Sequence, residues 1–303
     1  MRPESFYSRS DDSRRLRRKR PGQKRSSQKV VKPKSRWLWV FGLLALWLVC
    51  TGATAFQPLS YRLEQFPQWQ TKPPVEAARG DLTYPDWFEG DWTVTTTLQE
   101  LYAPLAPEVV TPGFDNNQDY LEEPVVFKAR FQKQEAGSPR LPWVRSLFPT
   151  SEQPAIVADR ALNGLNLARA YFNQANDGLG DRLVQKVTVD PQDPNRQVTR
   201  MRGDRQLIST VMGRLTEAPD PDHYLTTELS QQVFRGIPQP YLNEVETTTD
   251  YYHQSEINAE SAIVADQITA IYLSPQDPDY FKAGDRPVAL YRYRLEFEGN
   301  SLP

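Results

Sequence analysis

Cysteine and histidine are almost absent from this chain of 303 residues. It has one cysteine, Cys50, and two histidines, His223 and His253. Because Cys50 lies inside an apolar run, the rest of the chain has no disulfide, no thiol nucleophile and no thiolate metal site. That remainder must be held together by its own core, for which about 240 residues are sufficient.

Charge is missing from one stretch, because no Asp, Glu, Lys or Arg occurs between Arg36 and Arg62. Within it, residues 37–56 read WLWVFGLLALWLVCTGATAF, which is long enough to cross a bilayer as a helix. Trp37 and Trp39 lie at its N-terminal end, where interfacial tryptophans are favoured. The sequence therefore predicts one transmembrane helix at 37–56, with the lipid bilayer as a partner.

Acidic residues are scarce before this predicted helix. Residues 1–36 hold 14 basic and three acidic residues, a net charge of +11, and are expected to be disordered. The rest of the chain holds 22 basic and 35 acidic residues, a net charge of −13, which disfavours nucleic-acid binding. A basic segment before a span predicts a cytoplasmic N-terminus and an exported, lumenal or periplasmic C-terminal domain.

The apolar segment has a second interpretation. Ala53-Thr54-Ala55 has the small-x-small spacing of a signal-peptidase site, so cleavage after Ala55 would leave a soluble lumenal or periplasmic protein. The long basic region before the segment favours an uncleaved single-pass anchor instead.

The exported part begins with a proline-rich stretch and continues with strand patterns. Residues 57–80, which contain Pro58, Pro67, Pro73 and Pro74, are interpreted as a tether. Over residues 81–303, period-2 alternation predicts one antiparallel β domain of about eight or nine strands. The expected strands are 92–99, 124–134, 182–190, 196–202, 206–217, 223–234, 241–253, 257–273 and 286–298.

Helical spacing of apolar residues occurs once, over Pro154–Ala175. This pattern predicts one helix with its N-terminus near Pro154. Asn163-Gly164 lies in the middle of the pattern, where a glycine disfavours a helix.

The first strand opens with Gly90-Asp91-Trp92. A glycine lets the chain turn sharply into a strand, and a tryptophan just inside can cover the open end of a barrel. An arginine from the last strand, Arg292 or Arg294, can stack on this tryptophan. These two elements resemble the hallmark of lipocalins and their calycin relatives. The resemblance implies a calycin-like barrel in which the glycine, the tryptophan and one arginine are structural.

A longer resemblance covers most of residues 57–303. It rests on the stretches YPDWFEGDWTV, APLAPEVVTPGF, VADRALNGLNLARAYF, VDPQDPNRQ, ADQITAIYLSPQDPDYF and RPVALYRYRLEF. They look like an uncharacterised domain family of cyanobacteria with relatives in plant plastids. The resemblance implies a thylakoid or plasma membrane setting, and brings no assigned activity and no known catalytic residues.

Four aromatic residues at strand spacing are candidates for lining a ligand cavity. They are Tyr251, Tyr291, Tyr293 and Phe297. The interior of a barrel is either packed or hollow, so the same side chains can fill a dry core instead.

No catalytic residues, cofactor or metal site are predicted. Asp250, His253 and Ser255 are close in sequence, but strand alternation places Asp250 and His253 on opposite faces. The stretch DNNQDY at 115–120 has Tyr120 where a calcium loop requires glycine, which excludes an EF-hand.

These observations favour a non-enzymatic binding or assembly module at a photosynthetic membrane, with a membrane complex as its partner. The alternative is a lipocalin-like enzyme or carrier that acts on a hydrophobic or pigment-like ligand.

Overall fold

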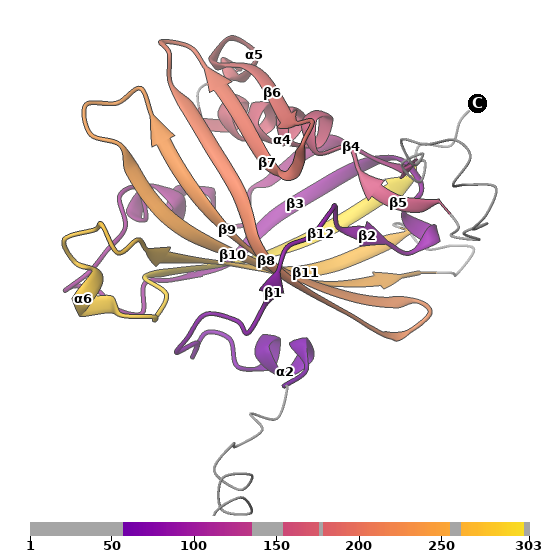
Figure 1. Cartoon of the computed structure of the whole chain (residues 1–303), viewed down its shortest axis with the longest axis horizontal. Helices are drawn as coiled ribbons and strands as arrows, with labels where there is room; N and C mark the ends of the chain where they lie inside the picture. Colours follow the sequence, from indigo (N-terminus) through magenta and orange to yellow (C-terminus); the bar gives the residue numbers. More distant parts are fainter. Residues whose placement is uncertain (1–56, 135–153, 176–177, 255–261, 300–303) are drawn as a thin grey trace, which may run out of the picture. The chain divides into compact units, whose positions relative to one another are not determined.

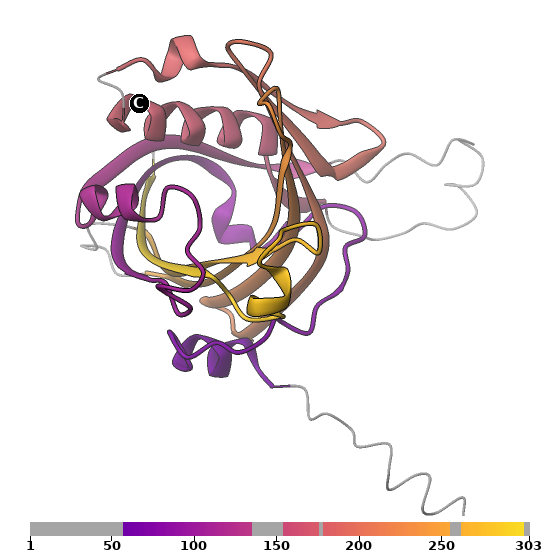
Figure 2. The same cartoon turned by 90° about the vertical axis from the view of Figure 1, so that its left-hand side faces the viewer.

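Antiparallel strands dominate the computed structural model, which describes residues 57–134, 154–175, 178–254 and 262–299. Twelve strands form one strongly curled sheet (Figures 1 and 2). Eleven of them follow the order β2-β5-β4-β3-β12-β11-β10-β9-β8-β7-β6, and β1 pairs with β8. The prediction of an all-β, antiparallel fold is confirmed, although the structure has more strands than the eight or nine expected.

The described part of the chain contains mostly long strands, one long helix and several short helices. The strands are β1 (Glu76–Ala77), β2 (Thr83–Tyr84), β3 (Gly90–Tyr102), β4 (Pro124–Gln134), β5 (Ala155–Ala158), β6 (Val184–Asp190), β7 (Asp193–Met201), β8 (Gln206–Asp220), β9 (His223–Arg235), β10 (Tyr241–His253), β11 (Ile263–Leu273) and β12 (Ala289–Gly299). The helices are α2 (Leu59–Glu64), α4 (Arg160–Ala175), α5 (Gly180–Leu183) and α6 (Tyr280–Ala283), with 3-10 turns η1 (Asp86–Phe88) and η2 (Asp115–Tyr120).

The sheet is a half-barrel, since its strand order runs from β2 to β6 without closing into a ring. Helix α4 lies along its open side (Figure 2). Asn163 accepts a hydrogen bond from the Arg130 amide at 2.7 Å and donates one to the Arg130 carbonyl at 3.0 Å. Asn166 donates to the Lys128 carbonyl of β4 at 2.8 Å. On the other side of the helix, Arg169 donates to the Val184 carbonyl of β6 at 3.3 Å. Helix side chains thus bond to strand backbone on both sides of the opening.

The helix begins later than the sequence predicts. Ala155–Ala158 form β5 instead of a first helical turn, and the Asp159 carboxylate accepts a hydrogen bond from the Leu162 amide at 3.1 Å. This contact is typical of an N-cap. At Gly164, which lies inside the helix, a Cβ would come within 2.7 Å of the side-chain amide nitrogen of Gln197 on β7, so Gln197 would have to move.

The segment predicted as a tether packs against the outside of the sheet. Leu59 and Trp69 are buried, and Trp69 packs on outward-facing Ile268, Ala270 and Tyr272 of β11. The apolar side chains of this segment therefore have a partner surface, which local sequence patterns do not reveal.

No helix among the described residues is long and apolar enough to cross a membrane. The span predicted at 37–56 and the basic segment 1–36 lie outside these residues.

Candidate binding cavities of the half-barrel

An aromatic cluster fills one end of the curled sheet. Trp92 is buried there, and its indole N–H donates to the Phe88 carbonyl at 2.8 Å. Phe297 meets the Trp92 ring edge-on, with 6.2 Å between the ring centroids. Gly90 has φ = +136°, a conformation that side-chain-bearing residues rarely adopt, so glycine is required at this entry to β3.

The two arginines predicted to stack on Trp92 lie elsewhere. In the pairing of β3 with β12, Trp92 is opposite Gly299, whereas Arg294 is opposite Thr97 and Arg292 lies further along. Their partners are Asp266, Glu100 and the Phe66 ring for Arg292, and Glu296 for Arg294. The stack is thus replaced by ion pairs on the outer face of β12, because strand parity turns both arginines away from the interior.

The structure separates the four aromatic candidates. Tyr251 and Phe297 belong to the aromatic cluster, with 6.3 Å between their ring centroids. Tyr291 lies toward the other end of β12, where it packs on Phe114 and accepts a hydrogen bond from Asn117 at 3.0 Å. Tyr293 lies between these groups. All four side chains face inward, and their role in ligand binding stays a prediction.

Four charged side chains form an ion cluster where the start of α4 meets β8 and β9. Arg160, at the start of α4, pairs with Asp81 at 2.7 Å and with Glu228 at 2.9 Å. Arg214 pairs with Glu228 at 2.8 Å and donates to the Asn195 side chain at 2.6 Å. Burial opposes the charge of Arg160, but the neighbouring carboxylates more than offset this effect and raise its pKa. Two cations and two carboxylates leave the cluster electrically balanced.

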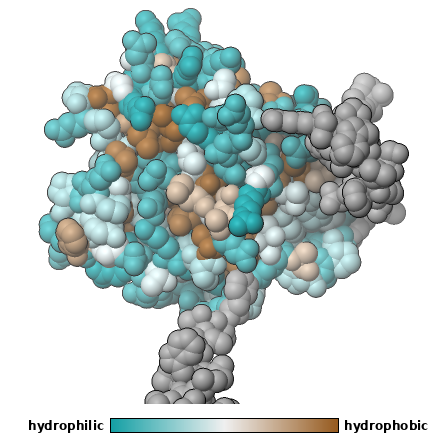
Figure 3. All heavy atoms as spheres, viewed as in Figure 1, coloured by the Kyte–Doolittle hydropathy of each residue, from teal (hydrophilic) through white to brown (hydrophobic). Residues whose placement is uncertain are grey.

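The central cavity of the half-barrel, here called the lumen, has a volume of about 390 Å³. Strands β7 to β10 supply most of its polar side chains, together with Val211, Val245 and Tyr251. Strands β3, β4 and β12 supply apolar side chains, and α4 supplies Leu167 together with Arg160 and Asn163. The polar side chains include Gln197, Ser209, Ser230, Gln232 and Thr247, and the apolar ones include Val94, Phe127, Leu167 and Leu295. The surface itself is largely hydrophilic, with apolar residues gathered toward the middle of the face in Figure 3.

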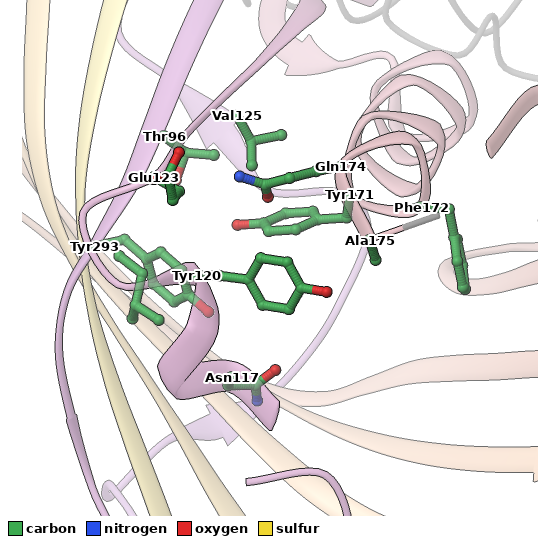
Figure 4. A pocket seen from close by; sticks show the side chains of 11 residues that line it. Thr96, Asn117, Tyr120, Glu123, Val125, Tyr171, Phe172, Gln174, Ala175 and Tyr293 are labelled. Atoms are coloured by element: carbon green, nitrogen blue, oxygen red, sulfur yellow. The ribbon is translucent and has the colours of Figure 1, made fainter. Parts of the chain in front are cut away.

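A second cavity of about 200 Å³, here called the tyrosine pocket, lies further along the inner side of α4 (Figure 4). Its lining includes Thr96, Tyr120, Val125, Tyr171, Gln174 and Tyr293. Burial raises the pKa of Tyr171, and the neighbouring side chains of Thr96 and Tyr293 oppose this effect. The pocket therefore combines largely apolar walls with tyrosine hydroxyls.

Sequence reasoning missed two residues of this pocket. Tyr120 counted only as a mismatch to a calcium loop, yet it lies in η2 at the pocket wall. Tyr171 continues the stripe of Arg160, Gly164 and Leu167 at helical spacing, so the pattern of α4 contained a signal for its inward direction.

Each histidine pairs with an aspartate. Asp250 pairs with His223 at 2.6 Å, and His253 pairs with Asp222 at 2.9 Å, whereas Ser255 lies outside the described residues. Burial raises the pKa of Asp250, and its contact with His223 opposes this effect. Within the described ranges, no group of three or more His, Cys, Asp or Glu side chains is arranged to hold a metal ion.

Comparisons with curated proteins and with solved structures find no match. A family model matches residues 76–301, which include every strand of the curled sheet and both cavities. The chain therefore belongs to the family described as Domain of unknown function (DUF6816).

Proposed function

We propose that this chain is a non-enzymatic binding module, tethered by residues 37–56 at a photosynthetic membrane. In this proposal the half-barrel takes a planar, largely apolar ring into the tyrosine pocket. The tether rests on the uncharged run between Arg36 and Arg62, and the membrane setting rests on the sequence resemblance. The observation that carries the binding role is the tyrosine pocket itself (Figure 4).

The size and lining of the pocket suggest the chemical class of the ligand. A cavity of roughly 150 Å³ is large enough for benzene, so about 200 Å³ suits one or two fused rings. Val125 and Leu98 offer apolar contact, and the hydroxyls of Tyr120 and Tyr171 offer hydrogen bonds. A ring that carries acceptor oxygens satisfies both kinds of wall.

Two neighbouring residues of β4 provide a matched test. Val125 faces the pocket, whereas Val126 is 56% exposed on the other face of the strand. Val125→Trp places an indole in the pocket, and Val126→Trp adds the same indole to the surface. Calorimetric titration with 1,4-naphthoquinone would use the full chain in phosphatidylcholine nanodiscs, with empty nanodiscs as the blank.

The proposal expects saturable binding to the unmodified chain and to Val126→Trp, and loss of binding in Val125→Trp. Urea unfolding would establish that both variants fold. Absence of binding to the unmodified chain, or equal binding to both variants, would contradict the proposal.

An assembly role is the second candidate, and one exposed side chain favours it. Phe281 in α6 is 92% exposed, so its ring is accessible to a partner surface. If α6 docks on a membrane complex, Phe281→Ser should abolish co-purification of that complex and leave naphthoquinone binding unchanged. Unchanged co-purification would reject this docking role.

A further inference from the structure

A row of polar side chains crosses the inner wall of the half-barrel. Gln197 of β7 lies opposite Ser209 of β8, which lies opposite Gln232 of β9, which lies opposite Asn243 of β10. Directly opposed residues share one face of a sheet, and the first three line the lumen. Ser230 adds a hydroxyl to this wall, two residues before Gln232 on the same strand.

The row contains hydrogen-bonding capacity that the protein does not use. Asn243 is only 6% exposed, and its Oδ1 is the single buried side-chain polar atom without a partner in the described ranges. Within the same ranges, the side chains of Ser209, Ser230 and Gln232 line the lumen and make no hydrogen bond to other protein groups. Asn243 is not among the residues that line the lumen, so the hydrogen-bonding capacity open to a ligand there belongs to Ser209, Ser230 and Gln232.

Strands β3, β4 and β12 line the lumen with apolar side chains, among them Val94, Phe127 and Leu295. The ion cluster of Arg160, Arg214, Asp81 and Glu228 is balanced, and so offers no unpaired charge to an ionic ligand. Amides and hydroxyls both donate and accept hydrogen bonds, as the hydroxyls of a polyol do. A ring with hydroxyls on its rim and C–H groups on its face matches both kinds of side chain.

We propose that the lumen binds a neutral, hydroxyl-rich ring of the pyranose or cyclitol type. The lumen-lining members of the row and Ser230 bond its hydroxyls, and Phe127 and Leu295 pack on its C–H face. The lumen volume of about 390 Å³ lies in the range of small-molecule sites. This site is separate from the tyrosine pocket, so it does not depend on the function proposed above. The ring can come from a free sugar or from the headgroup of a neutral glycolipid.

Gln232 and its neighbour Gln231 allow a matched test on β9. Gln232→Leu removes an amide from the lumen, whereas Gln231→Leu makes the same change on the outer face. The full chain in phosphatidylcholine nanodiscs, which carry no sugar, would be titrated with methyl β-D-glucopyranoside, myo-inositol and glucuronate. Saturation-transfer NMR would report binding, and circular dichroism would establish that both variants fold.

The proposal expects saturable binding of at least one neutral probe and weaker binding of glucuronate. Gln232→Leu should weaken the neutral probe by about tenfold, as expected for one lost hydrogen bond in an enclosed site, and Gln231→Leu should not. Nanodiscs that contain monoglucosyl diacylglycerol distinguish the sources. Competition by this lipid indicates a headgroup site, and its absence indicates a free sugar.

Three results would overturn the proposal. The first is that neither neutral probe nor the glycolipid binds. The second is that Gln232→Leu and Gln231→Leu lose affinity for the neutral probe equally. The third is that glucuronate binds more tightly than the neutral probes. The first result would mean that the lumen is only hydrated. Because naphthoquinone binding reports on the tyrosine pocket, the two proposals can fail independently.

Discussion

The buried carboxylate of Glu246 should make the fold depend on the segment before the curled sheet. Glu246 is 0% exposed, and Arg62 in α2 donates to its two oxygens at 2.5 and 2.6 Å. Tyr272 and Thr248 donate to the same carboxylate at 2.6 and 2.8 Å. The Arg62 guanidinium also lies 3.9 Å from the centroid of the Trp69 ring. Arg62→Met would keep much of this packing and remove the cation.

The expected cost follows from the loss of the only cation that contacts Glu246 among the described residues. Removing one partner of a buried ion pair typically costs about 3–5 kcal/mol, because the other charge stays desolvated. The two neutral donors of Glu246 remain, so the lower half of this range is expected. For a domain of this size, each kcal/mol lowers Tm by about 2–4 °C.

Urea unfolding of Arg62→Met, compared with Arg294→Met, tests this reasoning. Arg294 lies on the outer face, 3.8 Å from Glu296, so its loss should change the unfolding free energy by less than about 0.5 kcal/mol. Adding Glu246→Gln to Arg62→Met should recover part of the loss, since it removes the uncompensated charge. A cost below about 1 kcal/mol for Arg62→Met would refute the assignment of Glu246 as a carboxylate that requires Arg62.

Three further changes have expected outcomes. Trp92→Ala should cost about 3–5 kcal/mol in urea unfolding, whereas Trp92→Phe should cost about 1–3 kcal/mol, because it leaves the buried Phe88 carbonyl without its indole donor; equal costs would reject this division. Asn163→Leu should lower the unfolding free energy by about 1 kcal/mol and accelerate hydrogen exchange of the Arg130 amide. Unchanged exchange of this amide would show that α4 does not protect the edge of β4. Burial raises the pKa of Tyr251 from 10.0 to about 12, so the folded state retains a proton that the unfolded state loses in this window. The unfolding free energy should therefore fall as pH rises from 10 to 12, with Tyr251 contributing a slope of up to about 1.4 kcal/mol per pH unit that Tyr251→Phe removes; an unchanged slope in this variant would contradict the burial of the phenol.

Local patterns predicted the long strands well. The sequence expectation and the structure agree on 124–134 for β4 and 241–253 for β10, because alternation over ten or more residues is a strong signal. The short strand β5 was missed, since four apolar residues before a helical pattern look like a helix start. The hydrogen bonds of Asn163 and Asn166 to the backbone of β4 were also missed. Single side-chain contacts of this kind produce no periodic pattern in the sequence.

The sites were only partly predictable for a related reason. The structure places Tyr251 and Phe297 in the interior, where either expected role was possible, and places Arg292 and Arg294 on the outer face, away from Trp92. Contacts such as Arg62 with Glu246 join residues that are 184 positions apart. No local pattern encodes such a pairing, so a proline-rich stretch was interpreted as a tether although it carries the partner of a buried charge.

A ligand held in the tyrosine pocket should stay with the protein during gentle purification. Native mass spectrometry of the full chain, isolated from its native host without denaturation, can be compared with that of Val125→Trp and Val126→Trp. We expect one added mass, belonging to a planar ring compound, on the unmodified chain and on Val126→Trp, and none on Val125→Trp. The absence of any added mass on all three chains, or the same added mass on all three, would contradict this expectation.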